Sequence, residues 1–172
     1  MNDLHRWIRA IPGFPLPGVT FRDVTPLLAD ATAFAACVDR LAEPWRDLHV
    51  QIVCGIEARG FIFGVALAQK LGAGFVPVRK PGKLPPPVVG VDYALEYGHD
   101  RLEASQGTLR RGQRVLIVDD VLATGGTLAA ACTLVHELGG ELVGASVLIE
   151  LDALRGRARL PTGTVLHALL HY

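Results

Sequence analysis

Short, continuously apolar runs alternate with amphipathic runs along most of this chain. Apolar runs of four to ten residues suit buried strands, and the longer runs between them have helical spacing. Strands that are apolar throughout indicate a parallel sheet covered by helices on both faces. The expected strands are residues 50–55, 75–78, 114–120, 141–150 and 164–170, and the expected helices are residues 31–45, 60–72 and 127–140.

Residues at the helix ends support these boundaries. Asp30 stands where an N-cap is expected for the first helix, and Gly72 stands where the second helix should end. Two segments break the alternation. Residues 11–28 are rich in Pro and Gly and predict an irregular loop. Residues 79–113 form a long polar connection, typical of a functional lid, in which YALEY and RLEA are expected to pair as a hairpin.

Length and composition set the class of protein. A chain of 172 residues predicts one domain, here 1–172, with a hood at about 1–30 and a lid at about 80–112. The 17 basic residues balance the 17 acidic ones, which argues against a nucleic-acid partner. No apolar run reaches the roughly 18 residues that cross a membrane. The three cysteines, which form no CxxC pair, and the lack of a signal peptide predict a reduced, cytoplasmic protein with buried thiols.

The stretch VLIVDDVLATGGT at residues 115–127 carries most of the chemistry. Gly125 and Gly126 allow a tight turn, and the helix that follows turns its positive end toward it. With the hydroxyls of neighbouring threonines, this makes a phosphate cradle. Asp119 and Asp120 precede it, and carboxylates accept bonds from vicinal hydroxyls or hold a hydrated divalent cation. A sugar phosphate would use both parts. Alternatively, the acids merely end a strand and the glycines merely turn the chain.

Two more strand ends carry cations, and open parallel sheets bind ligands at such ends. Arg59 in EARG offers a planar guanidinium suited to phosphate, and Arg79, Lys80 and Lys83 cluster in RKPGKLP. Each is also consistent with ordinary solvated surface. The sequence has neither a Walker A motif nor GxGxxG, so it does not predict a P-loop or a dinucleotide-binding site.

These motifs together resemble a known family. VLIVDDVLATGGT resembles the phosphoribosyl diphosphate (PRPP) signature of type I phosphoribosyltransferases. Over nearly the whole chain the resemblance is closest to the adenine phosphoribosyltransferases. Besides the signature, the matching motifs are PGVTFRDVTPLL, GIEARGFIFG, PVRKPGKLP, YALEYG and LIELDALRGR, in the same order.

The resemblance implies a type I phosphoribosyltransferase fold, a Rossmann-like parallel sheet with an N-terminal hood and a flexible lid. It implies that Asp119 and Asp120 bind the ribose or support positive charge that develops on its ring. The 5-phosphate would be held by Ala123, Thr124, Gly125, Gly126 and Thr127.

For the leaving pyrophosphate, the resemblance implies a site made by Glu57, Ala58, Arg59, Lys80 and Lys83. The family often has a cis peptide at the position of Glu57–Ala58. In the lid, Glu96 is implied as a catalytic acid or base together with Arg59, although an isolated glutamate on a loop is usually solvated. Tyr97 would lie beside Glu96, and Tyr93 would pack the lid.

For the base, the resemblance implies that Phe21 stacks on adenine while the backbone of Thr20 and Arg22 contacts the purine edge. Leu151 would cover the other face. A 6-oxopurine enzyme would be expected to place a lysine near this strand end, where Glu150 and Leu151 stand, so adenine is favoured. The departures from the family are the run Pro85–Pro87, which stiffens one lid hinge, and His99.

The expected function is therefore transfer of the 5-phosphoribosyl group from PRPP to adenine, giving AMP and pyrophosphate. Mg²⁺ would be carried by PRPP rather than by a dedicated protein site, and the family usually forms homodimers. Two alternatives remain. One is a phosphoribosyltransferase for another purine or for orotate, and the other is a non-catalytic regulator that senses PRPP or nucleotides.

Overall fold

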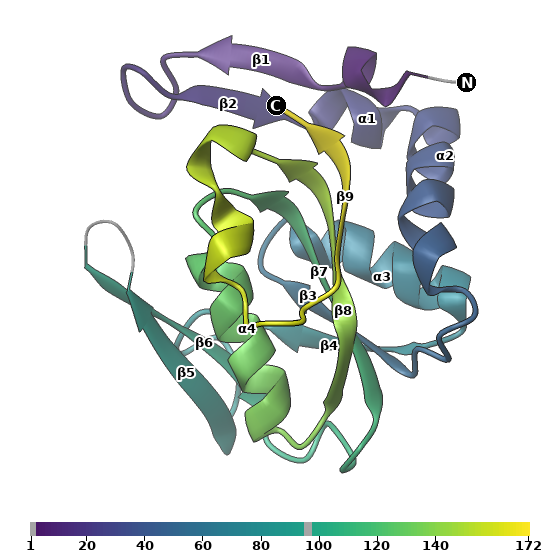
Figure 1. Cartoon of the computed structure of the whole chain (residues 1–172), viewed down its shortest axis with the longest axis vertical. Helices are drawn as coiled ribbons and strands as arrows, with labels where there is room; N and C mark the ends of the chain where they lie inside the picture. The colour runs from purple at the N-terminus through teal and green to yellow at the C-terminus, as the bar shows by residue number, and fades with distance from the viewer. Residues whose placement is uncertain (1–2, 95–97) are drawn as a thin grey trace. The chain divides into compact units, whose positions relative to one another are not determined.

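The computed structural model describes residues 3–94 and 98–172, and divides them between two compact units, Met1–Arg40 and Leu41–Tyr172. Figure 1 traces the chain from the N-terminus to the C-terminus. Within the described ranges, no helix has the length and apolar character needed to span a membrane.

The first unit contains a hairpin where the sequence predicted an irregular loop, so that prediction was wrong in part. Strands β1 (Arg9–Pro12) and β2 (Thr20–Asp23) pair antiparallel. Gly13 and Gly18 take φ values of 74° and 88°, which turn the chain between the strands without cost from a side chain. The other elements of this unit are the 3-10 helix η1 (Leu4–Trp7) and the helices α1 (Thr25–Ala29) and α2 (Ala31–Ala42).

The second unit is built on a five-stranded parallel sheet of order β4-β3-β7-β8-β9. This confirms the predicted α/β class, and each predicted strand is present within a few residues of its expected position (Figure 1). The strands are β3 (Ile52–Ile56), β4 (Gly74–Val78), β7 (Arg114–Leu122), β8 (Glu141–Glu150) and β9 (Leu166–His171).

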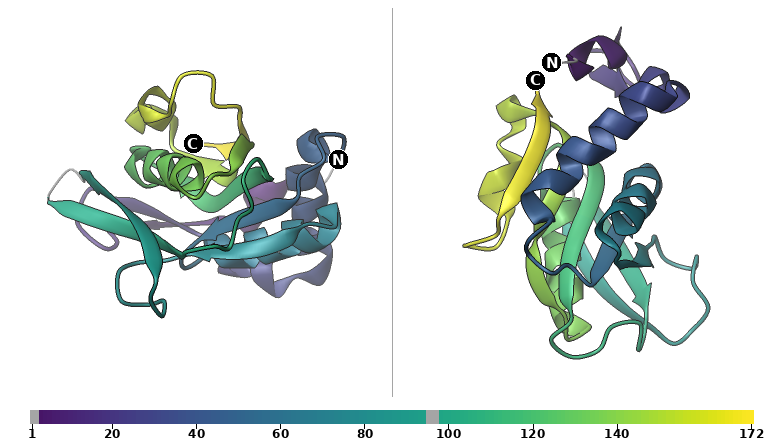
Figure 2. Two further views of the ribbon diagram at one scale, coloured as in Figure 1. Left: turned by 90° about the horizontal axis from the view of Figure 1, so that it is seen from below. Right: turned by 90° about the vertical axis from the view of Figure 1, so that its right-hand side faces the viewer.

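Helices α3 (Gly60–Leu71) and α4 (Gly126–Glu137) lie on opposite faces of this sheet (Figure 2). Helix α3 packs on β3, β7 and β4, and α4 packs on β7 and β8. Each right-handed crossover therefore covers one face, which makes the sheet doubly wound. Three 3-10 helices complete the unit: η2 (Glu43–Trp45), η3 (Asp152–Leu154) and η4 (Gly156–Arg159).

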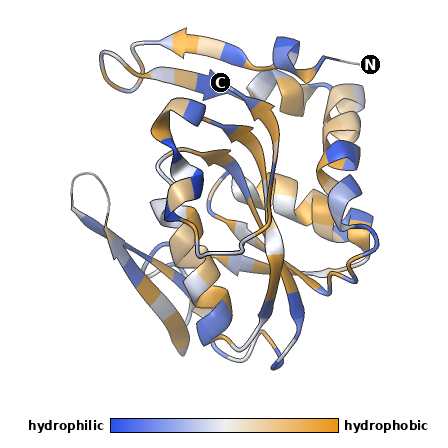
Figure 3. Cartoon of the chain, viewed as in Figure 1, coloured by the Kyte–Doolittle hydropathy of each residue, from blue (hydrophilic) through white to orange (hydrophobic). Residues whose placement is uncertain are grey.

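One large hydrophobic cluster lies between the sheet and α4, and buried residues such as Phe63 and Leu67 of α3 cover the other face of the sheet. In β7, Val115 and Ile117 are fully buried in this cluster, and the central strands are apolar along most of their length (Figure 3). All three cysteines are buried free thiols, which confirms their predicted role as small apolar residues. Burial raises the pKa of Cys37 and Cys54 to about 12 and that of Cys132 to about 11.

The caps predicted at Asp30 and Gly72 are confirmed, but α2 and α4 both end three residues before their predicted ends, α4 at Glu137. The Asp30 side chain accepts a bond of 2.8 Å from the Ala33 N–H, and Gly72 closes α3 with a φ of 66°. The first helix ends at Ala42 rather than at Trp45, because a proline at position 44 disfavours α-helical geometry in the residue before it.

The long connection contains an antiparallel hairpin of β5 (Val88–Ala94) and β6 (His99–Ser105). A hairpin was predicted, but RLEA pairs with residues 89–92 rather than with YALEY. Backbone bonds of 2.8 and 2.7 Å between Arg79 and Glu103 join the hairpin to the chain that leaves β4. Residues of this hairpin are thereby held beside one of the predicted site loops.

Candidate active site

The segments with predicted chemistry follow the carboxyl ends of parallel strands. Glu57 follows β3, Arg79 follows β4, Ala123 follows β7 and Leu151 follows β8. Because these strands are parallel, their carboxyl ends share one edge of the sheet, which is where open α/β sheets bind ligands. The sequence analysis placed EARG, RKPGKLP and DDVLATGGT at strand ends, and the structure has all three at this edge.

A concave cradle lies between β7 and α4. The loop of residues 123–125 and its neighbours line a cavity of roughly 80 Å³, which has room for several water molecules and hence for a phosphate group. The N-cap of α4 is Gly125, which has no side chain to bond the first N–H groups of the helix. Those donors and the helix dipole favour an anion here. The lining residues are Asp119, Val121, Leu122, Ala123, Thr124, Gly125, Gly126, Thr127, Leu128 and Val147.

Two glycines brought together by the fold shape this cradle. Gly125 has a φ of 84°, and a Cβ there would lie 2.2 Å from the carbonyl oxygen of Gly156. A Cβ on Gly156 would in turn lie 2.3 Å from the carbonyl oxygen of Ala123. Gly156 was not among the predicted site residues, since only the tertiary structure places it against the loop.

Asp119 and Asp120 lie near the carboxyl end of β7. The strand extends two residues beyond its predicted end, to Leu122. Asp120 is buried, and Nη2 of Arg59 lies 2.6 Å from its Oδ2 in an ion pair. Burial raises the pKa of both carboxyls, and the neighbouring Asp120 charge raises that of Asp119 further, while Arg59 partly offsets the shift in Asp120. The site thus places two adjacent carboxyl groups, both with raised pKa, beside the Arg59 guanidinium.

Arg59 is the N-cap of α3, and the chain reaches it through a cis peptide at Glu57–Ala58, as the family resemblance implied. The next residue, Gly60, lets the helix start against the end of β7. A Cβ on Gly60 would lie 2.9 Å from both Asp119 Oδ1 and the Val118 carbonyl oxygen. A glycine at this position therefore allows Arg59 to approach the carboxylates.

Some cations of the basic cluster after β4 already have partners within the protein. Arg79 donates to Glu57 Oε2 at 2.9 Å and stacks over the Phe61 ring at 5.8 Å. Glu57 also accepts the Lys80 backbone N–H at 2.9 Å, so it anchors this loop to the end of β3. Lys83 is exposed. Of the predicted cluster, Arg79 therefore has a structural role that the sequence did not indicate.

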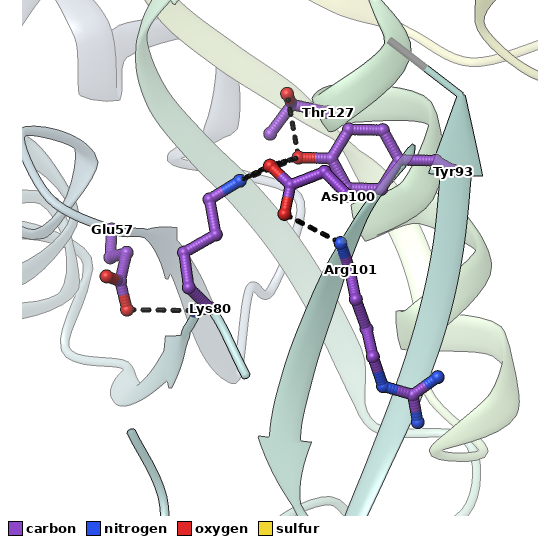
Figure 4. Close-up of polar contacts among 6 residues, drawn as sticks. All are labelled: Glu57, Lys80, Tyr93, Asp100, Arg101 and Thr127. Atoms are coloured by element: carbon purple, nitrogen blue, oxygen red, sulfur yellow. Dashed lines mark hydrogen bonds and ion pairs between the residues drawn. The ribbon is translucent and has the colours of Figure 1, made fainter. Parts of the chain in front are cut away.

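The Lys80 side chain points to the hairpin. Its ammonium contacts Asp100 Oδ2 and donates to the Tyr93 hydroxyl at 2.8 Å (Figure 4). The Tyr93 hydroxyl is also 3.1 Å from Asp100 Oδ2 and 3.3 Å from Thr127 Oγ1. This network joins the loop after β4, the hairpin and the cradle. Asp100 was not among the predicted residues, because only the observed register of the hairpin places it opposite Tyr93.

The residues expected at the base lie in both units. Thr20, Phe21 and Arg22 belong to β2 of the first unit, where the Phe21 ring meets Phe14 edge-on at 5.3 Å. Leu151 directly follows β8 of the second unit and is half-buried. The other lid residues, Glu96 and Tyr97, lie outside the described residues.

A group of possible metal ligands lies at the ends of β8 and β9. Ligand atoms of Glu150, Asp152 and His171 lie within 4.8 Å of one another, an arrangement that the sequence did not suggest. Glu150 is buried, and its two oxygens accept bonds of 2.8 and 2.9 Å from Arg157 Nε. The guanidinium already balances this carboxylate, so the group is explained without a metal ion.

Comparisons with known proteins agree with this geometry. Residues 27–162 match the sequence profile of the phosphoribosyl transferase domain. A protein of Xanthomonas campestris strain B100 called adenine phosphoribosyltransferase is 57% identical over 165 residues, 96% of this chain and 89% of the relative.

Solved structures with the same name superimpose closely. That from Rhodothermus marinus has a TM-score of 0.94 at 47% identity, covering 98% of this chain and 96% of the other. That from Saccharomyces cerevisiae, in complex with an iminoaltritol bisphosphate and adenine, has a TM-score of 0.91 at 38% identity, covering 97% and 96%.

The doubly wound α/β fold, the match to the phosphoribosyl transferase domain and the superposition on solved relatives identify a type I phosphoribosyltransferase. The chain belongs to the phosphoribosyltransferase family and, within it, to the adenine phosphoribosyltransferases.

Proposed function

We propose that this protein transfers the 5-phosphoribosyl group from PRPP to adenine, giving AMP and pyrophosphate, as an enzyme of purine salvage. The observation that carries the proposal is the cradle at Gly125 with Asp119 and Asp120 at its edge. Donors for a phosphate and acceptors for a diol stand side by side, which matches the two ends of a ribose 5-phosphate. The relatives named adenine phosphoribosyltransferase support adenine as the base.

In this proposal the cradle holds the 5-phosphate through the N–H groups of residues 123–127 and the hydroxyls of Thr124 and Thr127. Asp119 and Asp120 accept bonds from the ribose hydroxyls. Purine N9 forms a bond to the anomeric carbon as the bond to the pyrophosphate oxygen breaks, with inversion, and the imidazole proton that adenine loses passes to the proposed base, Glu96. Positive charge develops on the ribose ring, and the two carboxylates stabilise it because they lie in a partly desolvated site.

The departing pyrophosphate takes the bonding electron pair and needs cations around it. Arg59 and Lys80, with help from Lys83 and the backbone of Glu57–Ala58, are proposed to bind it. Asp119 and Asp120 offer the oxygen ligands that Mg²⁺ prefers, so the site fits a hydrated Mg²⁺ that arrives with PRPP. When bound, that ion would neutralise part of the diphosphate charge.

For the base, we propose that Phe21 stacks on adenine, Thr20 and Arg22 contact its edge through their backbone, and Leu151 covers the other face. Support comes from the yeast relative, whose solved complex contains adenine. At the end of β8 the sequence has Glu150 and Leu151 rather than a lysine that could meet a 6-oxo group, and Glu150 is paired with Arg157 at 2.7 Å.

The lid is proposed to act through Glu96, with Tyr97 and Tyr93 beside the substrates, and to exclude water that would otherwise hydrolyse PRPP. Replacing Glu96 by Ala should reduce kcat strongly and leave the dissociation constant of PRPP nearly unchanged. If the affinity for PRPP fell by the same factor as kcat, the role of Glu96 would not be confined to the chemical step.

The test of the base is a comparison of turnover on adenine, hypoxanthine, guanine and orotate at saturating PRPP and Mg²⁺. The proposal expects adenine to be used with by far the largest kcat/KM. Preference for any other base would favour another phosphoribosyltransferase. Binding of PRPP without turnover on any base would favour a regulator.

We also propose a homodimer that acts in the cytoplasm, as the family resemblance implies. The buried free thiols are consistent with a reducing compartment. Light scattering on the purified protein, over a range of concentrations, would distinguish a dimer from a monomer.

A further inference from the structure

Both cations proposed to bind pyrophosphate are paired with carboxylates in this structure. Arg59 pairs with Asp120, which the proposed function already uses for the ribose. Lys80 pairs with Asp100, to which the proposed function gives no role. The Lys80 ammonium must leave this carboxylate, or share it, whenever it binds a diphosphate.

The fold brings Asp100 to Lys80 by a specific route. Asp100 pairs directly with Tyr93 across the hairpin, and backbone bonds between Arg79 and Glu103 fix the hairpin beside the loop that carries Lys80. Figure 4 shows the Asp100 carboxylate between the Lys80 ammonium and the Tyr93 hydroxyl. The second oxygen, Oδ1, accepts the Arg101 backbone N–H at 2.7 Å, so the carboxylate is oriented from two sides.

Both groups are charged at neutral pH. Burial alone would lower the pKa of Lys80, but the bonds to Asp100 and Tyr93 outweigh it and raise that pKa above its ordinary value. Burial alone would raise the pKa of Asp100, but the bonds from Lys80, Arg101 and Tyr93 lower it. The side chains of Lys80 and Asp100 remain 34% and 26% exposed, so solvent screens the pair and a multiply charged ligand can displace the carboxylate.

We propose that Asp100 is a positioning residue that holds Lys80 at the edge of the site and lowers the affinity for diphosphate ligands. This inference rests on the proposed function, in which Lys80 binds pyrophosphate. The carboxylate competes for the ammonium and also repels the incoming anion, and both effects weaken binding. In exchange, Lys80 stays directed toward the cradle through Tyr93, which contacts Thr127. Weaker retention of pyrophosphate favours its release after transfer.

The test is Asp100→Asn, which keeps the shape and an acceptor oxygen but removes the charge. Titration of the enzyme with inorganic pyrophosphate and Mg²⁺ in a calorimeter should give a dissociation constant roughly 3- to 10-fold lower than that of the wild type. The KM for PRPP should fall with it, while the KM for adenine stays unchanged. Asp100→Glu, which restores the charge, should return the dissociation constant toward the wild-type value.

Asp92→Asn is the matched control. Asp92 lies on the same hairpin, loses the same charge, and pairs with Arg101 at 2.8 Å while 71% exposed. It should leave pyrophosphate affinity unchanged. An equal gain in affinity in this variant would show a general charge effect and overturn the inference.

Lys80→Ala separates this inference from the proposed function. If Lys80→Ala does not weaken pyrophosphate binding, the proposed role of Lys80 fails. If Lys80→Ala weakens binding but Asp100→Asn leaves it unchanged or weaker, the role of Asp100 is overturned while that of Lys80 stands. In the double variant, Asp100→Asn should give little of the gain that it gives alone.

Discussion

Nη2 of Arg59 lies 2.6 Å from Oδ2 of Asp120, so the cation proposed for the pyrophosphate and a carboxylate proposed for the ribose are partners before either meets a ligand. The pair stabilises the buried Asp120 carboxylate next to the like-charged Asp119 at the end of β7. When PRPP binds, Arg59 would contact its diphosphate and Asp120 would contact the ribose diol in place of each other.

Replacing Arg59 by Ala is expected to lower kcat/KM for PRPP by roughly 10²–10³-fold, because a preorganised cation at the leaving group is lost. It should also change the pH profile. Arg59 lowers the pKa of Asp120 against the effect of burial, so its loss raises that pKa further. The acidic limb of kcat/KM should therefore move to higher pH.

The control for this variant is Arg46→Ala, which removes an exposed arginine that follows η2 and belongs to none of the proposed site loops. It should leave the rate and the pH profile unchanged. A profile for Arg59→Ala that keeps its acidic limb in place would contradict the electrostatic link to Asp120.

Gly125→Ala should damage the cradle. The residue has a φ of 84°, and the new Cβ would lie 2.2 Å from the Gly156 carbonyl oxygen, so the loop or the facing turn must shift. We expect the free energy of unfolding to fall on the order of 2 kcal/mol and the KM for PRPP to rise at least tenfold. Urea denaturation and initial-rate kinetics measure these two effects.

Gly163→Ala isolates the backbone part of that effect. Gly163 has a φ of 86°, and no atom lies within 4 Å of a Cβ built there. It should cost about 1 kcal/mol of stability and leave the KM for PRPP unchanged. If both variants had the same kinetics, close approach to Gly156 would not be what shapes the cradle.

Most of the fold followed from the sequence because apolar periodicity determines strands and helices locally. The cradle was also predictable, since Gly125, Gly126 and the flanking threonines are consecutive in the chain. Contacts that depend on tertiary structure were not. Gly156 meets Gly125, and Asp100 meets Lys80, only because the sheet and the hairpin bring distant segments together.

The hairpin of β1 and β2 shows a second limit of structure prediction from sequence patterns. Its Pro and Gly residues predicted a loop, and they do form the turn and the end of β1, but the residues on either side of that turn pair regularly as β1 and β2. Short strands rich in turn residues give little periodic signal.

Asp23 should make stability depend on pH. Bonds from Thr25 and Arg9 hold its pKa at about 2, below the ordinary 3.8. A lowered folded-state pKa adds stability that is fully present above the unfolded value and is lost as pH falls toward 2. Asp23→Asn should therefore lose about 1 kcal/mol near pH 7, since solvent at the exposed Arg9 weakens the pair.

Chemical denaturation at several pH values checks this expectation. The difference between wild type and Asp23→Asn should shrink between pH 4 and pH 2. A difference that stays constant over that range would mean that the charge on Asp23 is not what stabilises the hairpin.

The thiols should be unreactive in the native protein. Cys37, Cys54 and Cys132 are buried, and burial holds each thiol pKa at about 11 or 12, so little thiolate forms at pH 8. A chromogenic disulfide reagent should label the unfolded chain at all three sites within minutes and the native protein far more slowly. Rapid labelling of the folded protein would contradict their burial.

The most direct test of the central claim is product analysis with purified protein, adenine, PRPP and Mg²⁺. The proposed function predicts AMP and pyrophosphate in equal amounts, with almost no pyrophosphate released when adenine is omitted. Release of pyrophosphate that does not depend on adenine, or no AMP at any adenine concentration, would contradict it.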